Sequence, residues 1–178
     1  MSEEKDPIIL VDGSSYLYRA YHALPPLKTS KNQPTGAIKG VISMIKRVLI
    51  DHPDSPLAVV FDAKGKTFRH DMYSEYKANR PPMPEDLVQQ IEPIHRIISL
   101  MGIKLIMIPG VEADDVIGYL TNTTLKDSKC TIMSTDKDFL QLVSDRVRLY
   151  SPTKKITYDE ELVKKEFGVY PQNMLTCR

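Results

Sequence analysis

Short apolar runs alternate with amphipathic stretches along this chain, and that alternation limits the fold more than any other feature. The runs that predict buried strands are PIILVD (7–12), LAVVFD (57–62), IKLIMI (103–108) and CTIMST (130–135), followed by the shorter VRLYS and KKITY. The stretches of helical periodicity are 14–23, 36–50, 85–101, 116–125 and 159–167. Strands that alternate with helices predict an α/β domain, with a mostly parallel central sheet flanked by helices.

Acidic residues follow each of the first four predicted strands: Asp12, Asp62, Glu112, Asp114, Asp115, Asp136 and Asp138. If the sheet is parallel, these carboxylates converge on one edge, where ligands of open α/β sheets bind. Carboxylates a few ångströms apart repel one another, and a divalent cation offsets that repulsion. Hard oxygen ligands without histidine or cysteine favour Mg²⁺ or Mn²⁺ over zinc. Two such ions can stabilise both oxygens of a phosphoryl displacement.

Each acid, taken singly, also has a purely structural explanation. Asp12, which precedes Gly13-Ser14, can cap a helix, and Asp62 can belong to a turn. The acids at 112–115 and 136–138 can serve as helix caps and as partners of the helix dipole. A helix needs only one capping residue, however. The number of acids that follow the four main strands is therefore larger than capping explains.

A local excess of basic residues between Lys64 and Arg80 suggests a nucleic-acid contact. The members of this stretch are Lys64, Lys66, Arg69, Lys77 and Arg80, with Tyr76 among the aromatic residues between them. Such a stretch can bind phosphates and stack on bases. A solvated charged loop explains the same composition equally well.

Several classes of protein fit the sequence poorly. No GxGxxG follows the first strand and no GxxxxGK[ST] occurs, so we expect no nucleotide cofactor. Cys130 and Cys177 lie far apart and outside any CxxC pair, which argues against a zinc or redox motif. The acidic N-terminus is unlike a signal peptide, and no apolar run is long enough to cross a membrane.

Four long segments together resemble a known family. LVDGSSYLYRAYHALPPL, VVFDAKGKTFRHDMYSEYKANRPPMPEDL, GVEADDVIGYL and STDKDFLQLV are similar to the N-terminal 5′-nuclease domain of bacterial DNA polymerase I, a member of the flap-endonuclease and PIN-like group. The resemblance runs from Ile8 to Asn173. It implies a single PIN-like 5′-nuclease domain over residues 1–178, with a helical arch at about 64–84.

The resemblance also implies roles for individual residues. The acids matching the first, catalytic metal site are Asp12, Asp62, Glu112, Asp114 and Asp115, and those matching the second site are Asp136 and Asp138. Lys77 and Arg80 match catalytic arch residues that bind the scissile phosphate. Further DNA contacts are expected from Arg19, Lys64, Lys66, Arg69 and Tyr76.

The implied activity is metal-dependent hydrolysis of DNA at 5′ ends or 5′ flaps during replication and repair. We expect Mg²⁺ or Mn²⁺ as cofactor, DNA as partner, and a monomer in the bacterial cytoplasm, with the nucleoid. Two alternatives stay open: a DNA-binding module with little catalysis, and a metal phosphohydrolase for small phosphate esters. The basic stretch argues against the second, because a small substrate needs no arch.

The sequence departs from the family pattern in two places. It ends at LTCR, where the family continues into a Gly-Asp-Ser-x-Asp-Asn segment, a helix–hairpin–helix and the polymerase domains. We therefore expect an incomplete second metal site and weak duplex binding. The family's Thr-Gly-Asp is here Ser134-Thr135-Asp136, and the loss of a flexible glycine is expected to shift Asp136 slightly.

Overall fold

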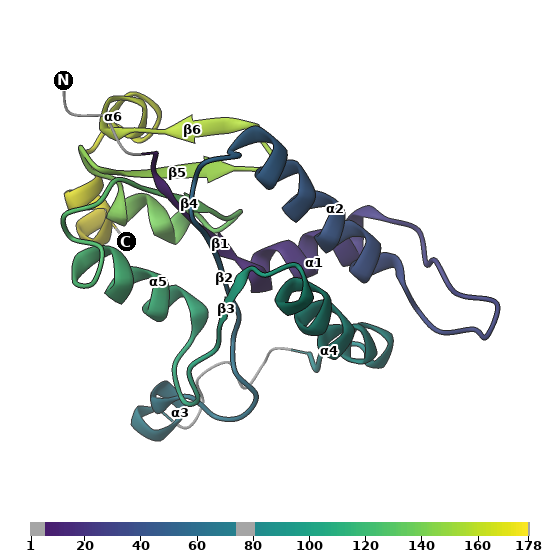
Figure 1. The fold of residues 1–178 in the computed structure, drawn as a ribbon. Helices are drawn as coiled ribbons and strands as arrows, with labels where there is room; N and C mark the ends of the chain where they lie inside the picture. Colours follow the sequence, from purple (N-terminus) through teal and green to yellow (C-terminus); the bar gives the residue numbers. More distant parts are fainter. Residues whose placement is uncertain (1–5, 74–80, 178) are drawn as a thin grey trace.

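A six-stranded sheet forms the centre of the computed structural model, which describes residues 6–73 and 81–177 (Figure 1). Its strands are β1 (Ile8–Asp12), β2 (Leu57–Val60), β3 (Lys104–Ile106), β4 (Cys130–Met133), β5 (Val147–Ser151) and β6 (Ile156–Tyr158). They lie in the order β3-β2-β1-β4-β5-β6, and only β6 runs antiparallel to its neighbour. The predicted α/β fold with a mostly parallel sheet is confirmed.

Helices cover both faces of this sheet. One face carries α1 (Gly13–Ala23), α2 (Gly36–Asp51) and α4 (Glu85–Leu100). The other carries α5 (Ala113–Asn122), the 3₁₀ helix η1 (Lys137–Leu142) and α6 (Glu160–Phe167), with a second 3₁₀ helix, η2 (Pro171–Cys177), against η1. The short helix α3 (Phe68–Met72) stands apart from both layers (Figure 1).

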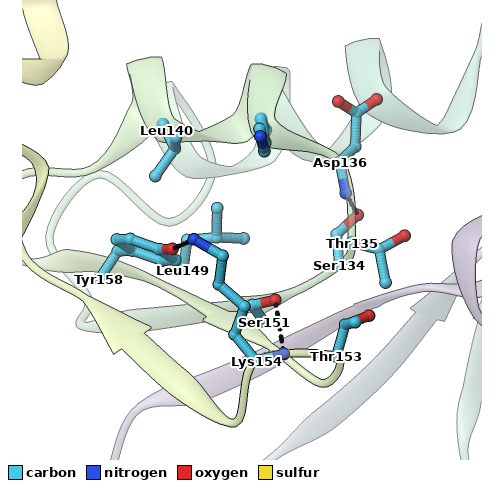
Figure 2. A pocket seen from close by; sticks show the side chains of 10 residues that line it. Ser134, Thr135, Asp136, Leu140, Leu149, Ser151, Thr153, Lys154 and Tyr158 are labelled. Atoms are coloured by element: carbon cyan, nitrogen blue, oxygen red, sulfur yellow. Dashed lines mark hydrogen bonds between the residues drawn. The ribbon is translucent and has the colours of Figure 1, made fainter. Parts of the chain in front are cut away.

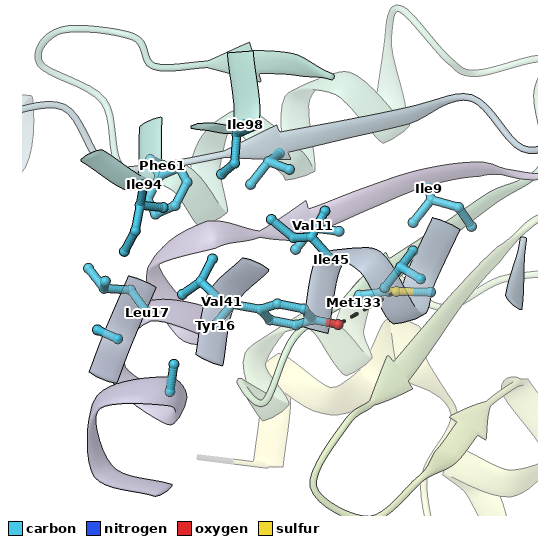
Figure 3. Close-up of a cluster of buried hydrophobic side chains, with 14 of the residues drawn as sticks. Ile9, Val11, Tyr16, Leu17, Val41, Ile45, Phe61, Ile94, Ile98 and Met133 are labelled. Carbon is cyan, nitrogen blue, oxygen red and sulfur yellow. Dashed lines mark hydrogen bonds between the residues drawn. The ribbon is translucent and has the colours of Figure 1, made fainter. Parts of the chain in front are cut away.

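The alternation of side chains along β1 builds two cores. Ile9 and Val11 point to the side of α1, α2 and α4, where Tyr16 and Ile45 are fully buried with them (Figure 3). Leu10 points to the opposite side and packs with residues of α5 and η1. Because both faces of β1 are buried, its sequence is a continuous apolar run.

Several element boundaries differ from the sequence prediction. Helix α5 begins at Ala113 rather than Val116, because Glu112 is already extended and the acids of the first turn favour the positive end of the helix dipole. Strand β3 is shorter than 103–108, and Met107 and Ile108 beyond it are 40% and 43% exposed. The segment after β4, which is absent from the predicted helical stretches, forms the 3₁₀ helix η1.

The predicted arch at about 64–84 is described only in part. It includes α3 and the segment 81–84, whereas residues 74–80 lie outside the described residues. The arch therefore stays a prediction. Among the described helices, none has the length and apolar character that a membrane span requires.

Candidate active site

The strand order reverses between β1 and β4, and the carboxyl ends of these two strands form the edge where open α/β sheets bind ligands. Asp12 ends β1, and α1 begins at the next residue, Gly13. A Cβ atom at Gly13 would lie 2.5 Å from the ring of Phe61, which follows β2. Glycine therefore lets α1 begin close against the end of β2, which brings Asp12 and Asp62 to the same edge.

A cavity of about 420 Å³ opens at this edge. The acids that line it are Asp12, Asp62, Glu112, Asp114, Asp136 and Asp138, which are six of the seven singled out in the sequence. The seventh, Asp115, lines a neighbouring groove between α5 and η1, together with Asp114 and Asp138. The carboxylates that follow four separate strands thus share one edge of the sheet.

Asp12 is the most deeply buried aspartate of the cavity, at 7% exposure. One of its oxygens accepts a hydrogen bond from the backbone amide of Ser15 at 3.0 Å, and the other accepts from Oγ of Ser134 at 2.6 Å. The pKa of Asp12 is raised to about 6, chiefly by burial and to a smaller extent by the charges of Asp62 and Asp136, while the two hydrogen bonds oppose the shift. A cation beside Asp12 would stabilise its charged form.

Capping explains some of the acids and not others. Asp12 caps α1, and Asp136 caps η1 by accepting from the backbone amide of Asp138 at 2.9 Å. Asp62 accepts from the first amide of α5, that of Ala113, at 2.7 Å and from Oγ of Ser14 at 2.8 Å. Glu112 sits at the N-cap of α5 without a side-chain cap bond, although it is only 6% exposed. Capping therefore leaves a buried carboxylate unexplained.

The segment between β4 and η1 is held by hydroxyl groups. Ser134 Oγ bridges Asp12 and the backbone amide of Asp136, the latter at 3.0 Å. Thr135 takes the family's glycine position without a left-handed backbone, and its amide donates to Oγ of Ser15 at 3.0 Å. The local geometry therefore does not require glycine, and Thr135 adds a contact to α1.

Arg69 of α3 pairs with the acids of α5. Its two terminal nitrogens lie 2.6 and 2.7 Å from the two oxygens of Asp115, and one of them lies 3.4 Å from Glu112. Partial burial raises the pKa of Asp114, and the charges of Asp115 and Glu112 add to this effect, whereas Arg69 opposes it.

The donor set fits a hard divalent cation in its chemistry, because it consists of carboxylate oxygens around a shared cavity. Across residues 6–73 and 81–177, no three His, Cys, Asp or Glu side chains are close enough to form a ready-made metal site. Asp115 in particular lines the neighbouring groove and would have to turn toward the cavity to join such a site.

The predicted basic contacts occupy different places. Lys64 and Lys66 are exposed on the loop between β2 and α3. Arg19 donates to Oγ1 of Thr153 at 2.6 Å and does not line the acidic cavity. The remaining three, Tyr76, Lys77 and Arg80, lie outside the described residues.

Tyr18 is a residue of the cavity that sequence reasoning missed. It lines the cavity and is 42% exposed, so a large ring surface faces solvent beside the acids. Its position, three residues after Ser15 and four after Ser14, could have indicated that it lies on the same face of the helix as these two serines. Residues at that spacing share one face of a helix.

A smaller pocket of about 160 Å³ adjoins the acidic cavity beyond the ends of β4 and β5 (Figure 2). The two hollows share Thr135 and Asp136. Lys154 and Tyr158 also line the smaller pocket. Nζ of Lys154 donates to the hydroxyl of Tyr158 at 2.8 Å and lies 3.3 Å from Glu166.

Comparison of the chain with known proteins identifies its family. Residues 7–168 match the model of the 5′-3′ exonuclease N-terminal resolvase-like domain. The chain belongs to this family. DNA polymerase I of Pseudomonas aeruginosa is 52% identical over 167 residues, which is 93% of this chain and 18% of that protein. The 5′-3′ exonuclease of Aquifex aeolicus is 45% identical over 168 residues, 94% of this chain and 58% of that protein.

This member of the 5′-3′ exonuclease family shares its fold with solved nucleases. The T5 D15 protein co-crystallized with metal ions superposes with a TM-score of 0.73 at 24% identity, over 92% of this chain and 62% of that one. The catalytic core of Rad2 in complex with a DNA substrate superposes with a TM-score of 0.58 at 21% identity, over 96% and 53% of the two chains. The chain spans between about a fifth and three fifths of the length of the curated relatives it matches.

Proposed function

We propose that this chain carries a 5′-nuclease site that hydrolyses phosphodiester bonds of DNA at 5′ ends or 5′ flaps, with Mg²⁺ or Mn²⁺ as cofactor. The observation that carries the proposal is the shared acidic cavity, lined by six carboxylates from segments that follow four strands. Membership of the 5′-3′ exonuclease family supports the same activity. Relatives named DNA polymerase I and 5′-3′ exonuclease support DNA as the substrate.

Two groups of acids would hold the cations. Asp12, Asp62, Glu112, Asp114 and Asp115 would hold the first, and Asp136 with Asp138 would contribute to the second. When bound, such ions supply a more acidic water and charge stabilisation at the phosphoryl oxygens. The raised pKa of Asp12 supports this role, because a buried acid among other acids is best satisfied by a positive charge.

The chain's own residues would position the acids and the DNA. Ser134 fixes one oxygen of Asp12, and the amide of Ser15 fixes the other, so that this carboxylate has one orientation. Tyr18 would stack on a base beside the phosphate that enters the cavity. Phosphate contacts carry no sequence information, so this arrangement would select DNA by structure rather than by sequence.

The basic residues of the predicted arch would hold the 5′ strand. The assignment of Lys77 and Arg80 to the scissile phosphate, and of Tyr76 to a further DNA contact, depends on the family resemblance alone. Lys64 and Lys66, exposed on the loop after β2, would extend the contact along the phosphate backbone.

The test is a single-turnover cleavage assay with a labelled 5′-flap DNA and Mg²⁺. Asp115→Asn should slow cleavage by about 100-fold or more, since metal-assisted charge stabilisation is worth several kcal/mol. Asp51→Asn is the matched control, because Asp51 pairs with Arg47 on the surface of α2 and does not line the acidic cavity.

Three outcomes separate the candidate functions. Cleavage by the native chain that fails only in Asp115→Asn supports the nuclease. Tight flap binding without cleavage in either protein would favour the DNA-binding alternative instead. Equal cleavage by the native chain and Asp115→Asn would remove Asp115, and the first metal site proposed to include it, from the mechanism.

A further inference from the structure

The guanidinium of Arg69 lies where two predicted metal ligands meet. It makes a two-pronged contact with Asp115, at 2.6 and 2.7 Å, and a longer one with Glu112, at 3.4 Å. Such paired N–H···O bonds are the strongest geometry that an arginine offers to a carboxylate. The side chains of Arg69, Glu112 and Asp115 are 31%, 8% and 27% exposed, so solvent screens this contact only in part.

Arg69 and a divalent cation need the same oxygen atoms. Each oxygen of Asp115 accepts a hydrogen bond from the guanidinium, so a cation that uses this carboxylate must share its lone pairs and lie beside a fixed positive charge. This is consistent with the lack, among the described residues, of three acidic side chains grouped closely enough for a metal. On the basis of the function proposed above, we infer that Arg69 competes with the divalent cation for Asp115 and Glu112.

The competition cannot be relieved by a change of pH at Arg69, because a guanidinium does not lose its proton in proteins. A divalent cation can relieve the competition by displacing the guanidinium from the two carboxylates. A divalent ion carries twice the charge and can take oxygens from Asp115 together with those of neighbouring acids. Arg69, by contrast, carries a single charge, and its position in α3 limits its contacts to nearby acids such as Asp115 and Glu112.

Helix α3 is suited to let Arg69 move away. It has five residues, and none of them is buried. The amide of Phe68 donates to the carbonyl of Gly110 at 2.9 Å, and a capping box between Thr67 and His70 closes the helix start. An element with few buried contacts separates from its neighbours at low free-energy cost.

Competition from Arg69 should lower the affinity of the chain for a divalent cation. When only a fraction of a protein is competent to bind, the apparent affinity falls by that fraction. Removal of the guanidinium should therefore raise the affinity for a divalent cation, although it removes a contact from the folded protein. A purely structural ion pair would have the opposite effect, because its loss would disorder the acids.

The experiment is calorimetric titration of the DNA-free chain with Mn²⁺. We expect Arg69→Gln to bind Mn²⁺ about tenfold more tightly than the native chain, which corresponds to about 1.4 kcal/mol. Arg69→Lys should give a smaller increase, because lysine keeps the charge but lacks the two-pronged geometry. Arg47→Gln, which breaks the surface pair with Asp51 and changes the net charge equally, should leave the affinity unchanged.

Thermal unfolding gives a second readout. Saturating Mn²⁺ should raise the Tm of Arg69→Gln more than that of the native chain, because tighter binding stabilises the folded state more. If Arg69→Gln does not fold, Arg69→Lys carries the comparison. Equal or weaker Mn²⁺ binding by the folded variants overturns the inference, and so does an absence of Mn²⁺ binding in every protein.

Failure of this inference is distinct from failure of the proposed function. A native chain that cleaves flaps while Arg69→Gln shows unchanged Mn²⁺ affinity refutes the competition and leaves the nuclease. A chain that never cleaves DNA, but whose Mn²⁺ affinity rises in Arg69→Gln, supports the competition and refutes the nuclease.

Discussion

The close approach of α1 to the end of β2 depends on the absence of a side chain at Gly13, and Gly13→Ala tests this directly. The added Cβ would meet three atoms of the Phe61 ring at 2.5 to 2.7 Å. Carbon atoms pack at about 3.5–4.0 Å, so either the ring or the first turn of α1 must move. Phe61 is 3% exposed and therefore has little space into which to move.

Overpacking of this kind costs about 1–3 kcal/mol, and the gain of about 0.4–1 kcal/mol that alanine brings by restricting the unfolded chain offsets part of that cost. For a chain of 178 residues, each kcal/mol shifts the Tm by about 2–4 °C. We therefore expect Gly13→Ala to lower the free energy of unfolding by about 1–2 kcal/mol. Because Asp12 and Asp62 flank the contact, cleavage should fall as well.

Gly118→Ala is the matched control. Gly118 lies inside α5, and a Cβ there would meet only Cδ1 of Leu142, at the ordinary distance of 3.9 Å. Alanine in a helix interior should then stabilise the protein by about 0.5–1 kcal/mol. Urea denaturation followed by circular dichroism, in the presence of a chelator, measures both variants. A Gly13→Ala midpoint at or above that of the native chain would refute the packing argument.

Three further predictions follow from the site and its surroundings. Ser134→Ala removes the hydroxyl donor to Asp12 and should lower the free energy of unfolding by about 1.5–3 kcal/mol in chelator, as measured by urea denaturation; an unchanged midpoint would contradict it. Tyr18→Ala should weaken flap binding by about tenfold in fluorescence anisotropy, whereas Tyr18→Phe, which keeps the ring, should bind like the native chain; equal losses would argue against stacking. Burial and the charge of Lys64 lower the pKa of His95 below 6.5, so the unfolded chain binds the extra proton first, and His95 should reduce stability as the pH falls through that value. His95→Phe should flatten the decline in urea midpoints between neutral and mildly acidic pH, and an identical slope in both proteins would refute the assignment.

The sequence predicted the sheet because its strands are buried on both faces and therefore appear as continuous apolar runs. It also indicated that acids would meet at one edge, because parallel strands bring their carboxyl ends together. The start of α5 was missed, since the acids that belong to its first turn look like loop residues when apolar periodicity alone is used. Periodicity detects the buried face of a helix and not its polar first turn.

Pairings across large sequence distances could not be predicted. Ser134 bonds to Asp12 over 122 positions, and Arg69 to Asp115 over 46, and nothing in either local sequence specifies the partner. The contacts of the Arg69 guanidinium with two acids were not predicted, and its predicted DNA contact stays a prediction. Which of several acids meets a cationic side chain is decided by packing, and not by local composition.

The most direct test of the account is an anomalous difference map from crystals of the chain soaked in Mn²⁺. We predict a strong peak inside the cavity lined by Asp12, Asp62, Glu112 and Asp114, with Asp115 turned away from Arg69 toward the ion. A map that shows no peak at these carboxylates at saturating Mn²⁺ would contradict the claim that the acids are gathered there to hold a cation.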